Sequence, residues 1–505
     1  MEILQSLMGG FGVALQPTNL MYCFIGVFIG NLLGVLPGIG ALAAISMLLP
    51  ITYTLDPTGA LMMLAGLYYG AQYGGATTSI LLNLPGVASH AVTCLDGHPM
   101  ARQGRAGQAL MTAMLSSFIG ASFGIVLMTL FSPYLAEIAF EFGPAEYFAL
   151  MLLGLIAAST LSSGSPLKGI ASVLIGLVFG LVGTDVNSGA MRFTLGMEHL
   201  SDGIALVALA MGLFGIADVL RGVNRIGSGE AISGRMSMRL SRTEVKQAAL
   251  PVLRGAGIGS FFGTLPGTGS AVASFISYAV EKKLARDPSR FGNGAIEGVA
   301  GPESCNNAAA QTAFIPTMTL GIPGDATMAL MLGALMIHNI QPGPQLISEH
   351  PDVFWGLIAS FWVGNLLLLV LNIPLVGIWT RLLSVPYRIV YPCVLFFISI
   401  GVYSTHNSVF DVGVVLAIGL FGYLAVRLGF QPAPILLGYV LGPMVEENFR
   451  RAMLLSRGDP LTFIEGPISA TCLAATALIL IWISVKQMRR KGSRRPLIGQ
   501  GGNNT

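Results

Sequence analysis

Long apolar stretches recur along the whole chain and are separated by short segments rich in polar residues, glycine or proline. A helix that crosses a bilayer needs about 20 predominantly apolar residues. The apolar residues form continuous runs instead of an alternating pattern, which argues against the strands of a transmembrane barrel. The pattern therefore predicts an all-α polytopic membrane protein. Runs near the required length are residues 20–36, 109–131, 147–161, 204–219, 353–376 and 468–485.

Composition agrees with this prediction. Of the 505 residues, 53% are hydrophobic and 10% are charged, whereas a soluble domain carries about 25% charged residues. The N-terminal segment MEILQSLMGGFGVALQP contains no lysine or arginine, so it lacks the basic region of a cleaved signal peptide. The cysteines lie apart within apolar stretches and form no CxxC pair, which predicts small buried side chains and neither disulfides nor a metal site. They are Cys23, Cys94, Cys305, Cys393 and Cys472.

Two sequence motifs occur twice, in the same order. GNLLGVLPGIGALAA at positions 30–44 matches GSFFGTLPGTGSAVA at 259–273 in the second half of the chain. TTSILLNLPG at 77–86 matches IPTMTLGIPG at 315–324. Two ordered pairs of motifs predict two related halves.

The distribution of positive charge predicts how the halves are oriented. The loop at 51–59 has no lysine or arginine, while its counterpart at 281–290 has four. The next pair of loops reverses this bias, with two arginines in 98–107 and none in 338–352. Because lysine and arginine accumulate in short cytoplasmic loops, equivalent loops should lie on opposite sides of the membrane. The two halves are therefore predicted to be inverted-topology repeats.

These features predict four regions: a first membrane repeat at 1–220, a basic cytoplasmic linker at 221–249, a second membrane repeat at 250–485, and a basic cytoplasmic tail at 486–505. The linker and the tail are assigned to the cytoplasm by the same charge rule. By inversion, the uncharged N-terminus should face the other side of the membrane.

The repeated Pro-Gly motifs interrupt apolar runs that would otherwise be helical. A broken helix in the membrane is tolerated only where it is buried in protein or lines a polar cavity. The N-terminus of the half-helix that follows offers free N–H groups and a positive dipole end to an anion. The two PGxG tips are thus candidate substrate-binding segments, although glycines at these positions could also serve close helix packing. The tip residues are Gly38, Ile39, Gly40, Gly267, Thr268, Gly269 and Ser270.

Polar residues gather beside the second pair of motifs. Their oxygen atoms suit hydrogen bonds to a carboxylate substrate or contacts with a small hard cation such as Na⁺. Hydrogen bonds between helices are the alternative. Glu303 and Asp325 are candidate proton carriers, because acidic side chains at membrane depth are usually functional, or else ordinary helix caps. The substrate candidates are Thr78, Ser79, Asn83, Asn306, Thr317 and Gly321, and the possible Na⁺ contacts lie near Asn83, Asn307 and Thr319.

Several longer segments resemble one family of membrane proteins. GVLPGIGALAAISMLLPITYTLDP, YYGAQYGGATTSILLNLPG, DGHPMARQGRAGQAL and GPESCNNAAAQTAFIPTMTLGIPGDATMALMLGAL are similar to the large membrane subunit of the bacterial tripartite tricarboxylate transporters, the TctA family. The resemblance spans nearly the whole chain. It implies a symporter subunit of the bacterial cytoplasmic (inner) membrane that takes up tricarboxylates such as citrate, or related carboxylates, together with Na⁺ or H⁺. It also implies two partners, a small four-helix membrane subunit and a periplasmic solute-binding protein.

We therefore expect a binding-protein-dependent secondary transporter in which a bundle of broken helices moves in an elevator-like manner. The chain contains neither a GxxxxGK[ST] phosphate loop nor an HExxH motif, and we expect no enzymatic activity, no cofactor and no nucleic-acid partner. A passive anion channel built from inverted repeats is the alternative, and it would not accumulate substrate against a gradient.

Overall fold

The computed structural model describes residues 2–36, 40–161, 165–185, 187–222, 237–265, 269–383 and 387–492. Within these residues the chain is almost entirely helical, and the strands are the two-residue antiparallel pair β1 (Gly183–Thr184) and β2 (Met191–Arg192). The all-α prediction is therefore confirmed. Helical segments long and apolar enough to cross a membrane are Pro17–Val35, Thr93–Ala139, Pro351–Asn372, Val409–Arg427 and Pro467–Val485.

The repeated motifs interrupt helices where the sequence predicts. In the first half α2 ends at Val35 and α3 begins at Ala41, with Gly40 as its N-cap. In the second half α11 ends at Gly263 and α12 begins at Gly269. The helices around the two breaks are α2 (Pro17–Val35), α3 (Ala41–Thr52), α4 (Pro57–Leu82), α11 (Arg242–Gly263), α12 (Gly269–Leu284), α13 (Glu297–Thr312) and α14 (Phe314–Leu320).

Glycines bring the backbones of α2 and α4 into direct contact. Ideal Cβ atoms placed on Gly26, Gly30 and Gly34 would lie 2.0, 2.2 and 2.5 Å from carbonyl oxygens of α4. Only glycine permits this approach. The facing oxygens belong to Met63, Leu67 and Ala71, so the residue numbers of the two helices rise together and the helices are parallel.

The second half of the chain repeats this contact at the residues that correspond to it in the sequence alignment of the two halves. Cβ atoms on Gly255, Gly259 and Gly263 of α11 would lie 2.2, 2.0 and 2.5 Å from carbonyl oxygens of α13. The facing oxygens are those of Gly301, Cys305 and Ala309, which are the counterparts of the three facing residues in α4 when 77–86 is aligned with 315–324. In each half the short helix after the break therefore returns toward the side from which the first helix came, and the two form a helical hairpin.

The central helices α4 and α13 run in opposite directions. The rings of Tyr68 and Phe314 lie 6.4 Å apart, between the middle of α4 and the residues that follow α13. At the other end, side chains of Ile80 near the end of α4 and Val299 near the start of α13 both face Gly97. Both helices are buried almost throughout, and their polar side chains must find partners within the protein.

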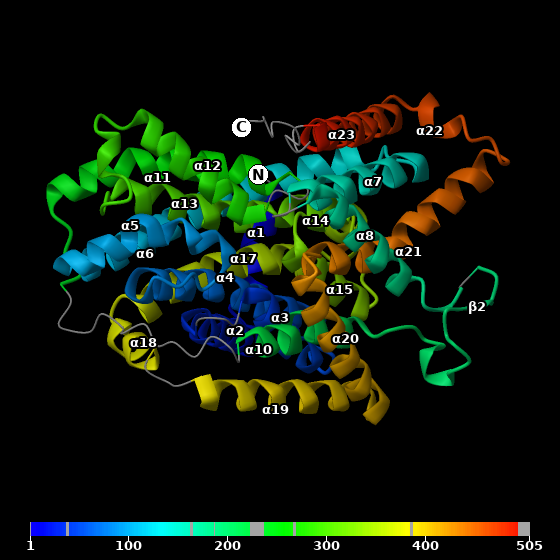
Figure 1. Cartoon of the computed structure of the whole chain (residues 1–505), viewed down its shortest axis with the longest axis horizontal. Coiled ribbons are helices and arrows are strands. Elements are labelled where there is room, and N and C mark those ends of the chain that lie inside the picture. The colour runs from blue at the N-terminus through cyan, green and yellow to red at the C-terminus, as the bar shows by residue number, and fades with distance from the viewer. Residues whose placement is uncertain are drawn as a thin grey trace, which may run out of the picture.

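The remaining elements lie beside these hairpins, and α11 and α12 themselves lie at the edge of the molecule (Figure 1). The pair β1–β2 projects from one end of the molecule, and α19 and α23 lie along opposite edges. These elements are α1 (Glu2–Ala14), η1 (Ala88–Ala91), α5 (Thr93–Met100), η2 (Ala101–Arg105), α6 (Ala106–Ala139), α7 (Pro144–Leu161), α8 (Pro166–Gly180), η3 (Glu198–Leu200), α9 (Leu206–Ala210), η4 (Met211–Ile216), α10 (Ala217–Gly222), η5 (Pro288–Arg290), α15 (Ala326–Ile337), α16 (Gln345–Glu349), α17 (Pro351–Asn372), α18 (Val376–Leu382), α19 (Tyr387–His406), α20 (Val409–Arg427), α21 (Pro432–Leu455), α22 (Thr462–Glu465) and α23 (Pro467–Gly492).

Two sequence predictions concern segments that fall partly outside the described residues. The predicted linker includes residues 223–236, and the predicted tail includes 493–505, neither of which is described. Among the cysteines, Cys23 and Cys305 are buried as predicted, Cys94 and Cys472 are partly buried, and Cys393 is exposed on α19. The prediction of burial is wrong for Cys393 because α19 lies at the edge of the molecule (Figure 1).

Candidate functional site

The two hairpin tips meet at one cavity of about 570 Å³, which we call the tip cavity. Gly40 lines it from the start of α3, and Gly269 and Ser270 line it from the start of α12. The structure thus brings together three candidates from opposite halves of the chain. The other tip candidates, Gly38, Ile39, Gly267 and Thr268, lie outside the described residues.

A third helix also begins at the tip cavity. Asp325 is the N-cap of α15, and its carboxylate accepts a hydrogen bond of 2.9 Å from the backbone N–H of Met328. The first N–H groups of a helix have no partner within the helix, and its dipole is positive at this end. The starts of α3 and α12 therefore present helix N-termini to the cavity, whereas the Asp325 carboxylate already caps that of α15. The described residues of the lining include no lysine or arginine and two acidic side chains, Asp218 and Asp325.

Side chains of α4 and η1 add hydrogen-bonding groups. Tyr68 and Gln72 line the tip cavity, and the Tyr68 hydroxyl interacts with Gln72 and Ser270. The Ser89 hydroxyl donates to Gln72 Oε1 at 3.1 Å. Sequence reasoning did not assign Tyr68 or Ser89 to a site, although Tyr68 begins the stretch that carries the family resemblance. In the sequence, Gln72 lies in the polar stretch that leads to the second Pro-Gly motif, which is a signal for a site. The packing of α4 against α2 and α3, which brings Tyr68 to the cavity, is seen in the structure.

The opposite wall of the tip cavity is mainly apolar and comes from other elements. It consists of Ala158 on α7, Phe214 on η4, Leu437 on α21 and their neighbours Ala433 and Pro434. Asp218 of α10 is the charged residue on this side, and it forms an ion pair with Arg221. A polar wall built from the hairpins thus faces a mainly apolar wall built from the surrounding helices.

Thr78, Ser79 and Thr317 do not line the tip cavity, but they shape the helix ends beside it. The Thr78 hydroxyl donates to the Val35 carbonyl at 2.7 Å, at the last residue of α2. The Ser79 hydroxyl lies 2.9 Å from the Gly75 carbonyl oxygen and 3.5 Å from that of Leu84. Thr317 repeats this pattern in the second half at 2.7 and 3.4 Å.

Asn83 and Gly321 occupy equivalent positions as well. Each is the residue that follows its helix, with a left-handed backbone and φ of 56° and 68° respectively. This conformation is easiest for glycine and is tolerated by asparagine. The Asn83 side chain is exposed, so the structure gives both residues a role in ending a helix.

Two of the possible Na⁺ contacts, Asn307 on α13 and Thr319 on α14, make hydrogen bonds within the protein. Asn306 and Asn307 lie on the buried face of α13, where both side-chain amides donate hydrogen bonds. The Thr319 hydroxyl donates to the Ile315 carbonyl at 2.7 Å. The part of the chain that the structure describes contains no group of three His, Cys, Asp or Glu side chains suited to a metal ion. Sodium contacts near Asn83, Asn307 and Thr319, which would use amide, hydroxyl and carbonyl oxygens, stay a prediction.

Glu303 and Asp325, the two candidate proton carriers, have different environments. Asp325 is a helix cap at the wall of the tip cavity. Glu303 is entirely buried in the middle of α13, and its carboxylate faces Thr93, Ser117 and His90. The cap interpretation therefore holds for Asp325 and fails for Glu303.

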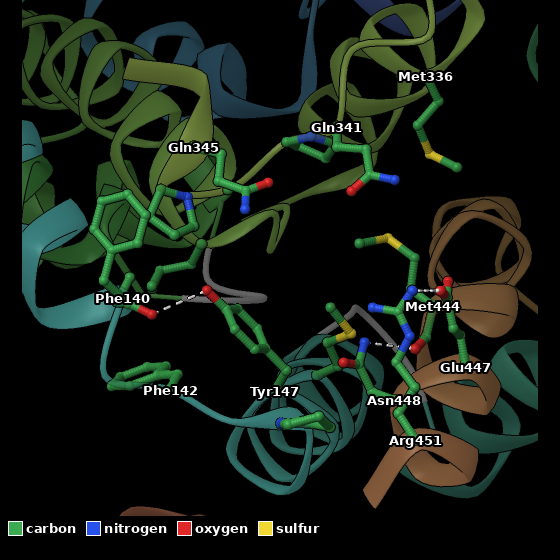
Figure 2. A pocket seen from close by; sticks show the side chains of 17 residues that line it. Phe140, Phe142, Tyr147, Met336, Gln341, Gln345, Met444, Glu447, Asn448 and Arg451 are labelled. Atoms are coloured by element: carbon green, nitrogen blue, oxygen red, sulfur yellow. Dashed lines mark hydrogen bonds and ion pairs between the residues drawn. The ribbon is translucent and has the colours of Figure 1, made fainter. Parts of the chain in front are cut away.

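A second hollow of about 380 Å³ lies between the loop before α16 and the C-terminal half of α21. Figure 2 shows Gln341 and Gln345 on one side and Glu447 and Arg451 on the other. Gln341 and Gln345 belong to the 338–352 region, whose lack of lysine and arginine predicts a non-cytoplasmic position.

Comparison with known proteins identifies the family. The sequence model of the tripartite tricarboxylate transporter TctA family matches residues 20–437. This chain belongs to the TctA family. An "uncharacterized 52.8 kDa protein in TAR-I ttuC′ 3′ region" of Agrobacterium vitis is 49% identical over 495 residues, covering 97% of this chain and 99% of that protein.

A second relative from Agrobacterium vitis, an "uncharacterized protein in TAR-II ttuC′ 3′ region", is 52% identical over 233 residues, which cover 46% of this chain and 96% of that protein. No solved structure matches the chain. Membership of the TctA family makes the protein a component of a tripartite transporter, which works with other subunits, and not a member of an enzyme family. Together with the apolar helices, it makes the protein a multi-pass membrane protein.

Proposed function

We propose that this protein is the permease subunit of a binding-protein-dependent secondary transporter in the bacterial inner membrane. It takes up tricarboxylates or related organic carboxylates by cation symport. Its partners in this proposal are a small four-helix membrane subunit and a periplasmic solute-binding protein that delivers the substrate.

One observation carries the assignment of the substrate site. Three helices, α3, α12 and α15, begin at the tip cavity, and two of them follow the repeated Pro-Gly breaks. Helix N-termini bind carboxylates through backbone N–H groups without the need for a basic side chain. In the proposal the tip residues 38–40 and 267–270 hold the carboxylates, and Tyr68, Gln72 and Ser89 bond the remaining polar groups of the substrate.

The arrangement of helices supports two inverted-topology repeats. The glycine contacts of α2 with α4 recur between α11 and α13, and α4 runs opposite to α13. In such transporters the substrate site lies where the two repeats meet. We propose that the hairpins and the central helices move together against the mainly apolar wall formed by α7, η4 and α21, which is an elevator-like motion.

The four predicted regions and the orientation of the termini complete the proposal. The basic linker at 221–249 and the tail at 486–505 are cytoplasmic, and the N-terminus is periplasmic. Labelling of single cysteines introduced at each terminus with a membrane-impermeant maleimide tests the orientation. Labelling of both termini from the same side contradicts it.

Uptake into proteoliposomes that contain the large and small membrane subunits, with the binding protein outside, tests the function. A panel of labelled carboxylates that begins with citrate is offered under Na⁺ and pH gradients. Gly40→Val is the informative variant, since a Cβ at Gly40 meets no atom within 4 Å and its φ of −70° suits any residue. We expect it to reduce uptake at least about tenfold, equivalent to ~1.4 kcal/mol of lost substrate binding.

Gly413→Val on α20 is the matched control, because a Cβ at Gly413 also meets no atom within 4 Å and the site lies away from the tip cavity. Equal uptake by both variants and the unmodified protein contradicts the assignment of the site. The same vesicles separate transporter from channel. Equilibration without accumulation against a gradient indicates the passive anion channel.

A further inference from the structure

We propose that Glu303 and His90 form a buried pair that binds the proton coupled to carboxylate uptake. This inference rests on the proposed function and adds the identity of the coupling ion and the residues that carry it. The two side chains come from opposite halves of the chain, and both are entirely buried.

The Glu303 carboxylate is held by polar groups from four elements. Thr93 of α5 donates a short hydrogen bond to Oε1. Around Oε2 lie the Ser117 hydroxyl of α6 at 3.3 Å, the Asn306 amide of α13 at 3.4 Å and Nε2 of His90 at 3.5 Å.

His90 has no other partner among the described residues. Neither ring nitrogen makes a hydrogen bond with any of them, and Nε2 points toward Glu303. The ring fits only because residue 75 of α4 is glycine, since a Cβ at Gly75 would lie 2.8 Å from Nδ1. A buried imidazole with free nitrogens beside a buried carboxylate is costly as structure alone, which points to a function in proton binding.

The charge of the surroundings favours one bound proton. Among the described residues no lysine or arginine pairs with Glu303, so neutral His90 and ionised Glu303 together carry a charge of −1. One proton on either residue brings the total charge of the pair to zero. Burial of an uncompensated charge is strongly unfavourable, so the moving unit crosses the membrane at lower cost when the proton is bound.

Other titratable groups near Glu303 do not supply a compensating charge. Tyr73 of α4 and Cys94 of α5 interact with the Glu303 carboxylate, and both are neutral in their ordinary forms. Further toward the start of α13, Asp96 accepts hydrogen bonds from Tyr278 and from three backbone N–H groups. Glu281 of α12 is paired with Arg254 of α11.

The donor set fits a proton better than Na⁺. A hard metal cation requires several oxygen ligands that can turn toward it. Two of the four groups around the carboxylate, His90 and Asn306, present nitrogen atoms, and the amide of Asn306 donates.

The short helix η1 links the pair to the substrate site. Ser89 lines the tip cavity and bonds Gln72, and the next residue, His90, faces Glu303. A substrate that shifts Ser89 therefore shifts His90, and proton binding at the pair acts back on the cavity wall. Such reciprocal coupling between two binding events is what symport requires.

Glu303→Gln tests the inference in the reconstituted complex. The amide is nearly isosteric with the protonated acid and cannot release a proton. The probe is the labelled carboxylate that wild-type vesicles accumulate most strongly in the panel, with citrate tested first. We expect accumulation driven by an inward proton gradient to fall at least about tenfold, while exchange of internal for external substrate stays within about threefold of wild type. Glu297→Gln, at the half-buried start of the same helix, where Glu297 pairs with Arg290 away from Glu303, is the matched control and should leave both activities unchanged.

His90→Gln provides a second measurement. Because one of two sites that can hold the proton is removed, the external pH at which uptake is half-maximal should move to lower values. An unchanged pH profile contradicts the participation of His90.

Three results overturn the inference. Glu303→Gln could retain proton-driven accumulation, wild-type vesicles could respond to a Na⁺ gradient but not to a proton gradient, or Glu303→Gln could lose exchange together with accumulation while remaining monodisperse. The last result indicates a role in substrate binding or structure. Wild-type vesicles that accumulate and exchange no member of the panel indicate instead that the proposed function itself is wrong.

Discussion

The glycine contact between α11 and α13 gives a quantitative prediction from two residues on the same helix. A Cβ at Gly259 would lie 2.0 Å from the Cys305 carbonyl oxygen, and Cβ atoms essentially never approach other atoms below 3.0 Å. The helices would have to separate locally by about 1 Å, and overpacking of this kind costs about 1–3 kcal/mol. A Cβ at Gly257, on another face of the same helix, meets no atom within 4 Å.

Both Gly259→Ala and Gly257→Ala gain up to about 1 kcal/mol from the higher helix propensity of alanine. This gain cancels when the two variants are compared, so the difference between them reports the packing cost alone. The expected difference is about 1–3 kcal/mol, with Gly257→Ala at least as stable as the unmodified protein.

The assay is the temperature at which half of the detergent-solubilised protein remains monodisperse in size-exclusion chromatography. Gly257→Ala should raise this temperature slightly and Gly259→Ala should lower it. Equal shifts for the two variants would show that α11 and α13 are not in backbone contact. The equivalent substitution in the first half, Gly30→Ala, should behave like Gly259→Ala, because its Cβ would lie 2.2 Å from the Leu67 oxygen.

Three further predictions concern side-chain contacts. Thr78→Val removes the hydrogen bond to Val35 and should cost about 1 kcal/mol, whereas Thr78→Ser should retain thermal stability and uptake. Asn365→Leu leaves the Tyr73 hydroxyl, which donates to Asn365 at 2.7 Å, buried without a partner, and should lower thermal stability by about 1–3 kcal/mol. Hydrogen bonds from Ser188 and Arg192 hold the pKa of Asp185 well below its ordinary value. The ionised Asp185 carboxylate therefore contributes its full stabilisation at any pH above its ordinary pKa. This stabilisation is lost only as pH falls toward the lower pKa that Asp185 has in the folded protein, so hydrogen exchange of residues 187–192, corrected for intrinsic rates, should stay unchanged from about pH 8 to 5.

Features that depend on local sequence could be predicted. Continuous apolar runs predicted the helices, and the Pro-Gly pairs predicted the breaks that follow Val35 and precede Gly269. The repeated motif also predicted that the two tips belong to one site, because related halves place equivalent segments around a shared axis. In the structure Gly40 and Gly269 line the same cavity.

The composition of the polar sites could not be predicted in the same way. His90 reaches Glu303 only because η1 and α13 are brought together by the fold, and nothing in the long stretch of sequence between them encodes that distance. Asn83 shows a case in which local sequence allows two roles. A polar residue beside a Pro-Gly pair suggested a ligand contact, but its ability to adopt a left-handed backbone explains its position.

The same glycines that join α2 to α4 also determine which part of the protein could move as a unit. Direct backbone contact fixes the hairpin tip relative to Gln72, and the corresponding contact of α11 with α13 fixes the second tip relative to Glu303. Across the tip cavity, side chains such as Phe214 and Leu437 offer mainly apolar surface, with Asp218 as the charged residue among the described residues of that wall. In the proposed elevator-like motion, the hairpin unit slides along this mainly apolar wall, where movement disrupts fewer directional contacts than it would within the unit, and the boundary between them passes through the cavity where the two tips meet.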